Sequence, residues 1–257
     1  MIGGGGGGIG TAITRRLTAA GAAVAVADAD GHRAEAMVAE LAAGGARAIA
    51  LVGDVRQQGV VEGFVARTVG ELGGVDVLVT VVGGQVAFVP AVPLHEMRDE
   101  DWELVFDLNL HYVARAVRVA IRAFLEQGTG GTIVSVGSVT GIMGAPNQAA
   151  YGAAKAGLLS LARTVGAEYA RSGIRMNVLA CGGIATPVTT AAGSSTETDG
   201  VPLGRLGSTQ EVADAALFFA SSQSSYVTGQ ALVIDGGVTV QGPFPTPAVD
   251  WRAITGP

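Results

Sequence analysis

Three polar residues of this chain have the types and spacing needed to move a proton to or from an oxygen atom. Tyr151 and Lys155 stand four residues apart, and Ser138 ends a valine-rich run upstream of them. On a helix this spacing puts the Lys155 ammonium group beside the Tyr151 phenol. A nearby positive charge lowers the pKa of a phenol from about 10, which makes it a better base at neutral pH. The sequence therefore predicts an acid/base tyrosine with Ser138 hydrogen bonded to the same substrate oxygen, although such a pair also arises by chance on helices.

The elements that must position these residues alternate between short apolar runs and longer helical patterns. We predict strands at 23–27, 46–52, 75–82, 132–136, 175–179 and 231–234. Helices are expected to begin near Ile9, His32, Gln57, Asp99, Gln148 and Thr209, with long helices over 99–127 and 148–171. Nearly continuous apolar strands are typical of a parallel sheet that is covered on both faces. The predicted fold class is α/β, a single-domain doubly wound (Rossmann-like) parallel sheet with helices on both faces.

A glycine run near the start of the chain fits a nucleotide-binding loop. Glycine occupies positions 3 to 8, and Gly4, Gly8 and Gly10 match a G-x-x-x-G-x-G register around Ile9. Such a loop lets the N-terminus of the following helix approach a pyrophosphate, although a glycine run also resembles a flexible linker. Only Met1 and Ile2 precede the run, where a strand of about five residues is expected. We therefore expect a shortened first strand, which is either vestigial or a sign that the natural N-terminus is missing.

Two strand-end carboxylates follow this loop. Asp28 comes directly after the 23–27 strand, where a carboxylate accepts hydrogen bonds from ribose hydroxyls and repels a 2′-phosphate. No basic residue lies in the glycine loop, so NAD(H) is predicted over NADP(H). Asp54 and Val55, after the 46–52 strand, are candidates for holding the adenine. A helix cap for Asp28 and an ordinary turn for Asp54 are the alternatives.

Composition excludes several other classes of protein. The 257 residues suffice for one domain with a sizeable core, and the formal net charge of −6 argues against nucleic-acid binding. A single cysteine, Cys181, excludes an internal disulfide, and the three histidines form no metal motif. We expect no metal and no membrane contact, and we predict a cytoplasmic location.

Together these residues resemble the short-chain dehydrogenase/reductase family, from the first glycines to Gly237. The family pattern also matches Asn109 and the stretches 179–187, 204–207 and 226–237. Three positions depart from it: Thr80 stands where Asn is usual, Cys181 where Pro is usual, and Gly3 where Thr is usual. These departures bear on stability and cofactor fit, because none of them removes a catalytic group.

The resemblance implies a role for each site residue. Tyr151 would be the general acid/base, Lys155 would lower its pKa and hold the nicotinamide ribose, Ser138 would polarise the carbonyl, and Asn109 would position a water. Besides Tyr151 and Lys155, the cofactor-binding residues would be Gly4, Gly8, Ile9, Gly10, Asp28, Asp54, Val55, Gly83, Gly182, Ile184 and Thr186. The substrate pocket would be lined by Gln85, Val86, Phe88, Thr140, Met143, Gly144, Gln148, Gly183 and Val188.

Three functions remain open on the sequence. The pocket residues carry no positive charge, which favours a neutral, largely apolar secondary alcohol or ketone as the substrate of an NAD(H)-dependent oxidoreductase. A reductase of 3-oxoacyl thioesters on a carrier protein or coenzyme A would need a cationic patch, for which Arg115, Arg118, Arg122 and Arg171 are available. A non-catalytic dinucleotide-binding protein is the third.

The remaining expectations concern assembly and the segments outside the sheet. The resemblance implies a homotetramer, and small residues such as Ala153 and Gly157 would allow close packing of the long helices. The segment 189–200, rich in Thr, Ser, Ala and Gly, is expected to close over the pocket. The catalytic domain is predicted to span 1–241. The proline-rich tail 242–257 is expected either to dock through Trp251 or to fray.

Overall fold

The computed structural model describes residues 7–187, 189, 198 and 200–242. The shortened first strand, Gly3, Gly4, Val188, most of the 189–200 segment and the tail from residue 243 lie outside these ranges. The sequence predictions made for them, including the boundary between a domain ending at 241 and the tail, stay predictions.

Strands in the described chain pair in parallel, as predicted. The sheet order β3-β4-β5-β8 joins β3 (Val77–Thr80), β4 (Gly131–Ser138), β5 (Ile174–Cys181) and β8 (Ala231–Ile234). A second pair consists of β1 (Val24–Asp28) and β2 (Ala48–Val52), and a short third pair of β6 (Ile184–Ala185) and β7 (Gly207–Ser208). The six strands predicted between residues 23 and 234 are present, with ends that differ by up to a few residues.

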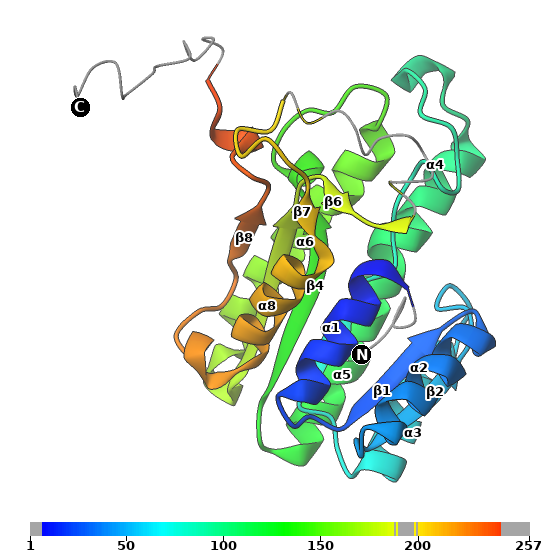
Figure 1. The fold of residues 1–257 in the computed structure, drawn as a ribbon, viewed down its shortest axis with the longest axis vertical. Coiled ribbons are helices and arrows are strands. Elements are labelled where there is room, and N and C mark those ends of the chain that lie inside the picture. The colour runs from blue at the N-terminus through cyan, green and yellow to red at the C-terminus, as the bar shows by residue number, and fades with distance from the viewer. Residues whose placement is uncertain (1–6, 188, 190–197, 199, 243–257) are drawn as a thin grey trace, which may run out of the picture.

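Helices cover both faces of these strands (Figure 1). One face carries α1 (Gly8–Ala19), α2 (Gly31–Ala43) and α8 (Thr209–Ala220), and the other carries α3 (Val60–Leu72), α5 (Tyr112–Gln127) and α6 (Ala149–Tyr169). This arrangement confirms the predicted doubly wound, Rossmann-like fold class. None of the described helices combines the length and apolar character needed to cross a membrane.

The strand side chains divide between two apolar cores. Val24 and Val26 of β1 pack with α1, α2 and α8, whereas Ala25 and Ala27 pack with α3 and α5. Leu78 and Val79 of β3 divide in the same way. Both faces of these strands are therefore dry, which explains why the sequence shows continuous apolar runs instead of alternation.

The long helix predicted over 99–127 is interrupted. It consists of α4 (Asp99–Phe106), a π-helical turn (Asp107–His111) and α5. The side chain of Asn109, in the middle of the π turn, donates through Nδ2 to the Val105 carbonyl oxygen at 2.8 Å. A π turn inserts one residue into a helix and often marks a functional position. Here it holds Asn109 completely buried.

Candidate active site

The three residues singled out by the sequence meet where β4 ends and α6 begins. Ser138 is the last residue of β4, and Tyr151 and Lys155 lie in the first two turns of α6. The Lys155 Nζ atom lies 5.4 Å from the centroid of the Tyr151 ring. Ser138 interacts with the Tyr151 hydroxyl by a hydrogen bond that favours the phenolate. The predicted cluster is therefore assembled by two elements that are neighbours along the chain.

The Ser138 hydroxyl is oriented by Thr140. The backbone N–H of Thr140 lies 3.2 Å from Ser138 Oγ and its Oγ1 lies 3.0 Å away, both as donors. A hydroxyl has two acceptor sites and one proton to donate. Because Thr140 fills both acceptor sites, the Ser138 proton is left for the Tyr151 oxygen or for a substrate oxygen beside it. Thr140 thus acts on Ser138, in addition to its predicted place in the pocket lining.

Lys155 is a buried amine. Its side chain is 3% exposed, and Nζ donates to the Val136 carbonyl oxygen at 3.1 Å. Burial disfavours the charged ammonium and lowers the pKa of Lys155 to about 8. Lys155 therefore loses its proton at a lower pH than an exposed lysine does.

The predicted effect of Lys155 on Tyr151 is not what the structure shows. Burial raises the pKa of Tyr151 above its ordinary value, and the hydrogen bond from Ser138 offsets this in part. The reason is that both groups lie in a poorly solvated site that disfavours either charge. In this state the Tyr151 phenol keeps its proton at neutral pH.

Asn109 joins the cluster through the loop after β3. Its Oδ1 accepts from the Gly84 N–H and its Nδ2 donates to the Gly84 carbonyl oxygen, both at 2.9 Å. A β-carbon built on Gly83 would lie 2.4 Å from Asn109 Oδ1 and 3.1 Å from Lys155 Nζ, and Gly83 has a φ of +154°. The position therefore requires glycine for close packing against both side chains. The water that the resemblance implies at Asn109 stays a prediction. The two hydrogen bonds between Asn109 and Gly84 were not expected from the sequence.

The glycine loop meets a second predicted cofactor segment. Gly7 is the N-cap of α1, and Gly8 has a φ of +44° that side chains rarely adopt. A β-carbon on Gly8 would lie 3.6 Å from Thr186 Cγ2, just after β6. Ile9 is partly buried, whereas Gly10 and Ile184 are fully so. The structure thus brings Gly8 and Thr186, which are far apart in sequence, into contact. Gly182 lies just before β6 and packs against Asp235.

Asp28 ends β1 as predicted and has a cationic neighbour that the sequence reasoning missed. Asp28 Oδ1 accepts from the N–H of Asp30, and Asp30 caps α2. Arg33, in the first turn of α2, pairs with Asp30 at 3.2 Å, and its Nη1 would lie 3.8 Å from a β-carbon on Gly7. The glycine loop itself contains no basic residue. The helix after β1 contains Arg33, which is the residue to consider for contact with a 2′-phosphate.

The turn after β2 lies beside the end of β1. The N–H of Gly53 donates to the Asp28 carbonyl oxygen at 3.1 Å. The Asp54 carboxylate pairs with Arg56 at 2.6 Å, which lowers the pKa of Asp54, and Val55 is buried. Asp54 and Val55 thus lie beside the end of β1, as predicted. The Asp54 carboxylate is already paired with the Arg56 guanidinium.

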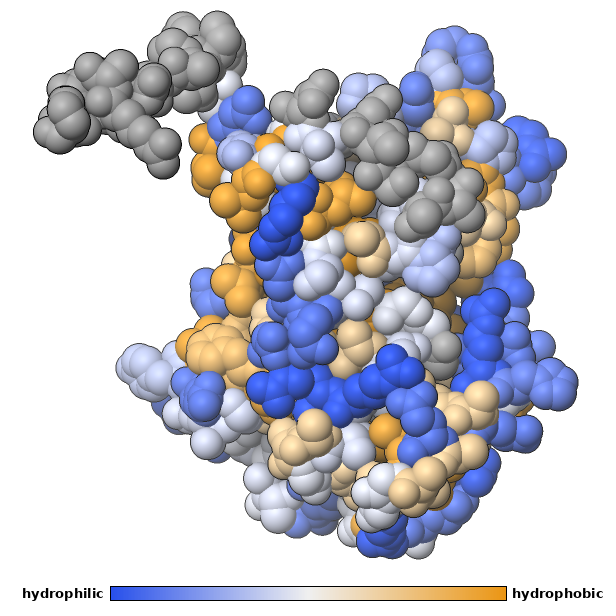
Figure 2. Space-filling view, in the orientation of Figure 1, coloured by the Kyte–Doolittle hydropathy of each residue, from blue (hydrophilic) through white to orange (hydrophobic). Residues whose placement is uncertain are grey.

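Most of the predicted pocket residues are exposed and apolar or small. Val86, Phe88 and Met143 are exposed, as are Gly144 and Gly183, whereas Gln148 is the N-cap of α6. Hydrophobic surface also gathers in the upper half of the face in Figure 2, around the place of β6 and β7 in Figure 1. Such surface suits an apolar substrate.

Gln85 differs from the other pocket residues, because it is buried. Its Nε2 donates to the Asn147 carbonyl oxygen at 3.1 Å, and its Oε1 has no hydrogen-bond partner within the described residues. Asn147 has a φ of +63° and lies just before α6. Gln85 therefore steadies the turn that leads into the helix of Tyr151.

Comparisons with known proteins agree with this geometry. A family model described as enoyl-(acyl carrier protein) reductase matches residues 5–239. The chain is 36% identical over 247 residues to a glucose 1-dehydrogenase of Gluconobacter oxydans, covering 92% of this chain and 90% of the relative. It is 38% identical over 236 residues to a cis-4-hydroxycyclohexanecarboxylate dehydrogenase of Sinomonas cyclohexanicum, covering 90% and 92%. It is 35% identical over 243 residues to a 3-oxoacyl-(acyl-carrier-protein) reductase of Thermotoga maritima, covering 93% and 97%.

A solved structure extends the likeness to three dimensions. The gluconate 5-dehydrogenase from Burkholderia cenocepacia, crystallised with NADP and tartrate, superposes with a TM-score of 0.86 at 31% identity. The match covers 94% of each chain. This chain belongs to the short-chain dehydrogenase/reductase family. It is an oxidoreductase that acts on alcohol and carbonyl groups.

Proposed function

We propose that this enzyme transfers a hydride between NAD(H) and a neutral, largely apolar secondary alcohol or its ketone, with Tyr151 as general acid/base. The observation that carries the proposal is the meeting of Ser138, Tyr151 and Lys155, with the Ser138 proton directed to the Tyr151 oxygen or to a substrate oxygen beside it. In the direction of reduction, the Tyr151 phenol gives its proton to the substrate oxygen while Ser138 hydrogen bonds that oxygen.

The residues around the glycine loop fit a dinucleotide. Gly8 begins α1, whose N-terminal N–H groups would bind a pyrophosphate, and the exposed Gly83 packs directly against Lys155. Asp28 would bind the adenosine ribose, Thr186 and Ile184 the carboxamide, and Lys155 the second ribose. When bound, the nicotinamide ring supplies or accepts the hydride.

The preference for NAD(H) rests on Asp28, and Arg33 opposes it. A carboxylate repels a 2′-phosphate, whereas a guanidinium attracts one. Arg33 is already paired with Asp30, and this pairing weakens the attraction of its guanidinium for a phosphate group. The related gluconate 5-dehydrogenase was crystallised with NADP, so measurement of kcat/KM with both cofactors is the decisive comparison.

The substrate class rests on the residues predicted to line the pocket, none of which is charged. Exposed Val86, Phe88 and Met143 supply apolar contact. We expect higher kcat/KM for cyclic or aromatic ketones than for keto acids of similar size. Faster turnover of keto acids would contradict the proposed substrate class.

Reduction of a 3-oxoacyl thioester is the second candidate. It is favoured by the Thermotoga maritima relative and by the description of the family model. Of the arginines available for a carrier, Arg115 already donates to the carbonyl oxygens of Val55 and Arg56. Acetoacetyl-coenzyme A serves as the probe. A kcat/KM above that of every neutral ketone would establish this candidate in place of the first.

Substitution of Tyr151 by Phe tests the catalytic assignment. Tyr151→Phe removes a hydroxyl and should reduce kcat by about 10²–10⁴-fold while NADH binding persists. Tyr226→Phe is the matched control, because the Tyr226 side chain is fully exposed. Retention of more than about a tenth of wild-type kcat, with hydride transfer rate-limiting, would exclude Tyr151 from this role.

We also propose that the enzyme is a cytoplasmic homotetramer. Leu232 and Val233 on the edge strand β8 are partly exposed, and uncovered apolar groups on a strand edge favour association. Light scattering at micromolar concentration measures the mass, and a monomer would contradict the proposal.

A further inference from the structure

Tyr112 is the first residue of α5, and its side chain is completely buried. Its backbone N–H donates to the Asp107 carbonyl oxygen, which closes the π turn that carries Asn109. Its hydroxyl donates to the Val82 carbonyl oxygen at 2.9 Å, in the segment that follows β3. Tyr112 therefore joins the π turn to the backbone that leads into Gly83.

Gly83 lies between two residues that are held by side chains of this helical segment. Tyr112 binds Val82 on one side, and the Asn109 carboxamide binds the residue that follows Gly83 on the other. A β-carbon built on Gly83 would lie 3.1 Å from Lys155 Nζ. The backbone at Gly83 is therefore one wall of the space that the Lys155 amine occupies, and Tyr112 helps to set the position of this wall.

The other wall comes from β4. Lys155 Nζ donates to the Val136 carbonyl oxygen at 3.1 Å. The preceding residue, Ser135, is the register partner of Thr80 at the end of β3, and their hydroxyls are hydrogen bonded at 2.9 Å. The Thr80 side chain also forms a hydrogen bond with the Tyr112 hydroxyl. Three buried hydroxyls, those of Tyr112, Thr80 and Ser135, therefore join α5 to both strands beside Lys155.

The Tyr112 hydroxyl acts as a hydrogen-bond donor and not as an acid or base. Burial raises the pKa of Tyr112, so the phenol keeps its proton at neutral pH. Thr80, its neighbour in the network, is one of the three positions that depart from the family pattern. The network of Tyr112, Thr80 and Ser135 is therefore a feature of this chain that the resemblance does not imply.

We propose that Tyr112 is a positioning residue for the reaction, because its hydroxyl, with those of Thr80 and Ser135, fixes the two walls between which Lys155 Nζ lies. The inference rests on the proposed function, in which Lys155 holds the nicotinamide ribose beside Tyr151. Without the Tyr112 hydroxyl the two walls move apart, water reaches the amine, and the amine shifts relative to the phenol of Tyr151. A displacement of about 1 Å can reduce the rate of a reaction by about 10²-fold.

Substitution of Tyr112 by Phe tests the inference, because it keeps the buried ring and removes only the hydroxyl. We expect kcat with NADH and a neutral ketone to fall by about ten- to hundredfold in Tyr112→Phe. The KM for the ketone should change little, because Tyr112 is buried beneath the site and makes no contact with the substrate.

A second measurement follows Lys155 without turnover. Lys155 is the only lysine in the sequence, so labelling lysine with carbon-13 gives a single set of side-chain NMR signals. In the wild-type protein these signals should titrate near pH 8, because burial lowers the pKa of Lys155 to about 8. In Tyr112→Phe we expect the midpoint to rise by about half a pH unit or more, toward the 10.5 of a solvated lysine.

The neighbours of the amine do not disturb this titration. Among the described residues, Tyr151 and Cys181 are the titratable side chains that face Lys155. Burial raises the pKa of both, and that of Cys181 rises to about 12. Both side chains are therefore neutral near pH 8, and the midpoint reports the surroundings of Lys155 itself.

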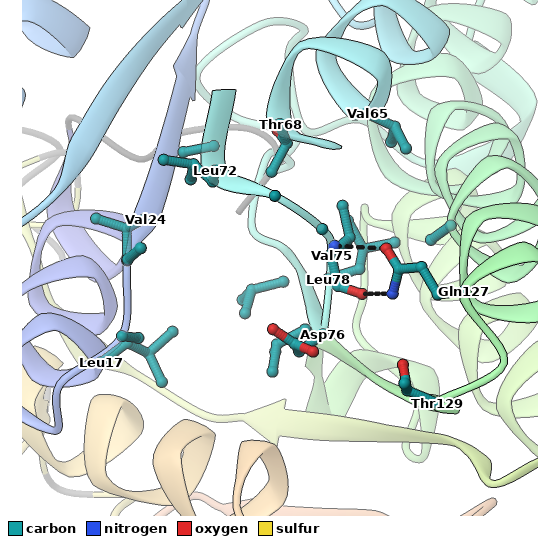
Figure 3. A pocket seen from close by; sticks show the side chains of 18 of the residues that line it. Leu17, Val24, Val65, Thr68, Leu72, Val75, Asp76, Leu78, Gln127 and Thr129 are labelled. Carbon is teal, nitrogen blue, oxygen red and sulfur yellow. Dashed lines mark hydrogen bonds between the residues drawn. The ribbon is translucent and has the colours of Figure 1, made fainter. Parts of the chain in front are cut away.

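Substitution of Gln127 by Met is the matched control for a purely structural loss. At the start of β3 the Gln127 carboxamide binds both the N–H and the C=O of Val75 at 2.8 Å (Figure 3). Its loss should lower Tm and leave kcat and the Lys155 midpoint unchanged. Changes in both quantities as large as those in Tyr112→Phe would show that any weakening of β3 has this effect, and they would overturn the inference.

Variants of Thr80 keep the inference testable if Tyr112→Phe does not fold. Thr80→Val removes a hydroxyl from the same network and should also raise the Lys155 midpoint. Thr80→Ser keeps the hydroxyl and should keep the wild-type midpoint. Unchanged kcat and midpoint in Tyr112→Phe, or in Thr80→Val where the first variant does not fold, would overturn the inference.

The proposed function and this inference fail in different ways. Absence of turnover with NADH and neutral ketones would contradict the proposed function. The NMR titration of the unliganded protein would still decide whether the Tyr112 hydroxyl positions Lys155.

Discussion

The part of the molecule that carries the catalytic residues and the part that carries the nucleotide loop are stabilised by different contacts. Around β3, β4 and α5, polar groups are buried and hydrogen bonded, as in the Thr80–Ser135 pair at 2.9 Å and the contacts of Asn109 with Gly84. Around α1 and α2, ion pairs such as Arg15–Glu40 at 2.7 Å lie in solvent. Unpaired buried polar groups are costly, whereas exposed ion pairs contribute little. The catalytic part should therefore be the more sensitive to single substitutions.

The largest difference is expected between two glycines. Gly83→Ala places a methyl group against Asn109 and Lys155 at a strained φ, and should lower the free energy of unfolding by about 2–4 kcal/mol and also reduce kcat. Gly63→Ala in α3 meets open space and should raise stability by up to about 1 kcal/mol, because alanine favours helices. Denaturant unfolding measures the free energy of unfolding of both variants. Similar changes at the two positions would show that the catalytic part is no more sensitive to substitution than α3.

Lys155 should give the catalytic part a pH dependence. Its pKa is about 8 in the folded protein and 10.5 as the reference for the unfolded chain, so the unfolded chain binds more protons between these values. The contribution of Lys155 to the free energy of unfolding therefore rises from pH 8 to pH 10.5. Below pH 8 the buried ammonium destabilises the folded protein by its full amount.

Lys155→Met isolates this effect. The variant gains stability relative to wild type below pH 8, and the gain shrinks toward pH 10.5. The buried thiol of Cys181, with its pKa raised to about 12, acts in the opposite direction above pH 9. Because the Lys155 charge itself lowers the pKa of Cys181, the comparison is made below pH 9, where the thiol is protonated in both the folded and the unfolded chain. Urea unfolding across this range measures the difference, and a constant value would show that the ammonium is not buried.

Cofactor choice tests the nucleotide part. Asp28→Ala should narrow the ratio of kcat/KM for NAD over NADP by about tenfold, because it removes a ribose ligand and a repulsive charge. Arg33→Ala should widen the ratio if Arg33 reaches the same phosphate. A wild-type preference for NADP would contradict the assignment of Asp28.

The smallest contrast compares one buried pair with one exposed pair. Thr80→Val leaves Ser135 without its partner and should lower the free energy of unfolding by about 1 kcal/mol. The double variant with Ser135→Ala should recover part of the loss. Arg15→Ala, which removes an exposed pair with Glu40, should leave the denaturation midpoint unchanged. Equal midpoints for Thr80→Val and Arg15→Ala would show that burial makes no difference here.

The order and type of the main strands and helices follow from the amino-acid sequence alone, because apolar periodicity is local. The sequence also places Tyr151 and Lys155 on one helix face, since four residues nearly complete a turn. Ser138 at a strand end and Gly8 at a helix start were likewise readable from adjacent residues.

Tertiary structure alone decided the electrostatics and the long-range contacts. Burial raised the pKa of Tyr151, where the sequence predicted that Lys155 would lower it, because desolvation depends on neighbours from distant segments. The position of Arg33 beside Gly7 and the hydrogen bonds of Asn109 with Gly84 have the same origin. Each depends on residues that are remote in the chain, and local patterns carry no information about such contacts.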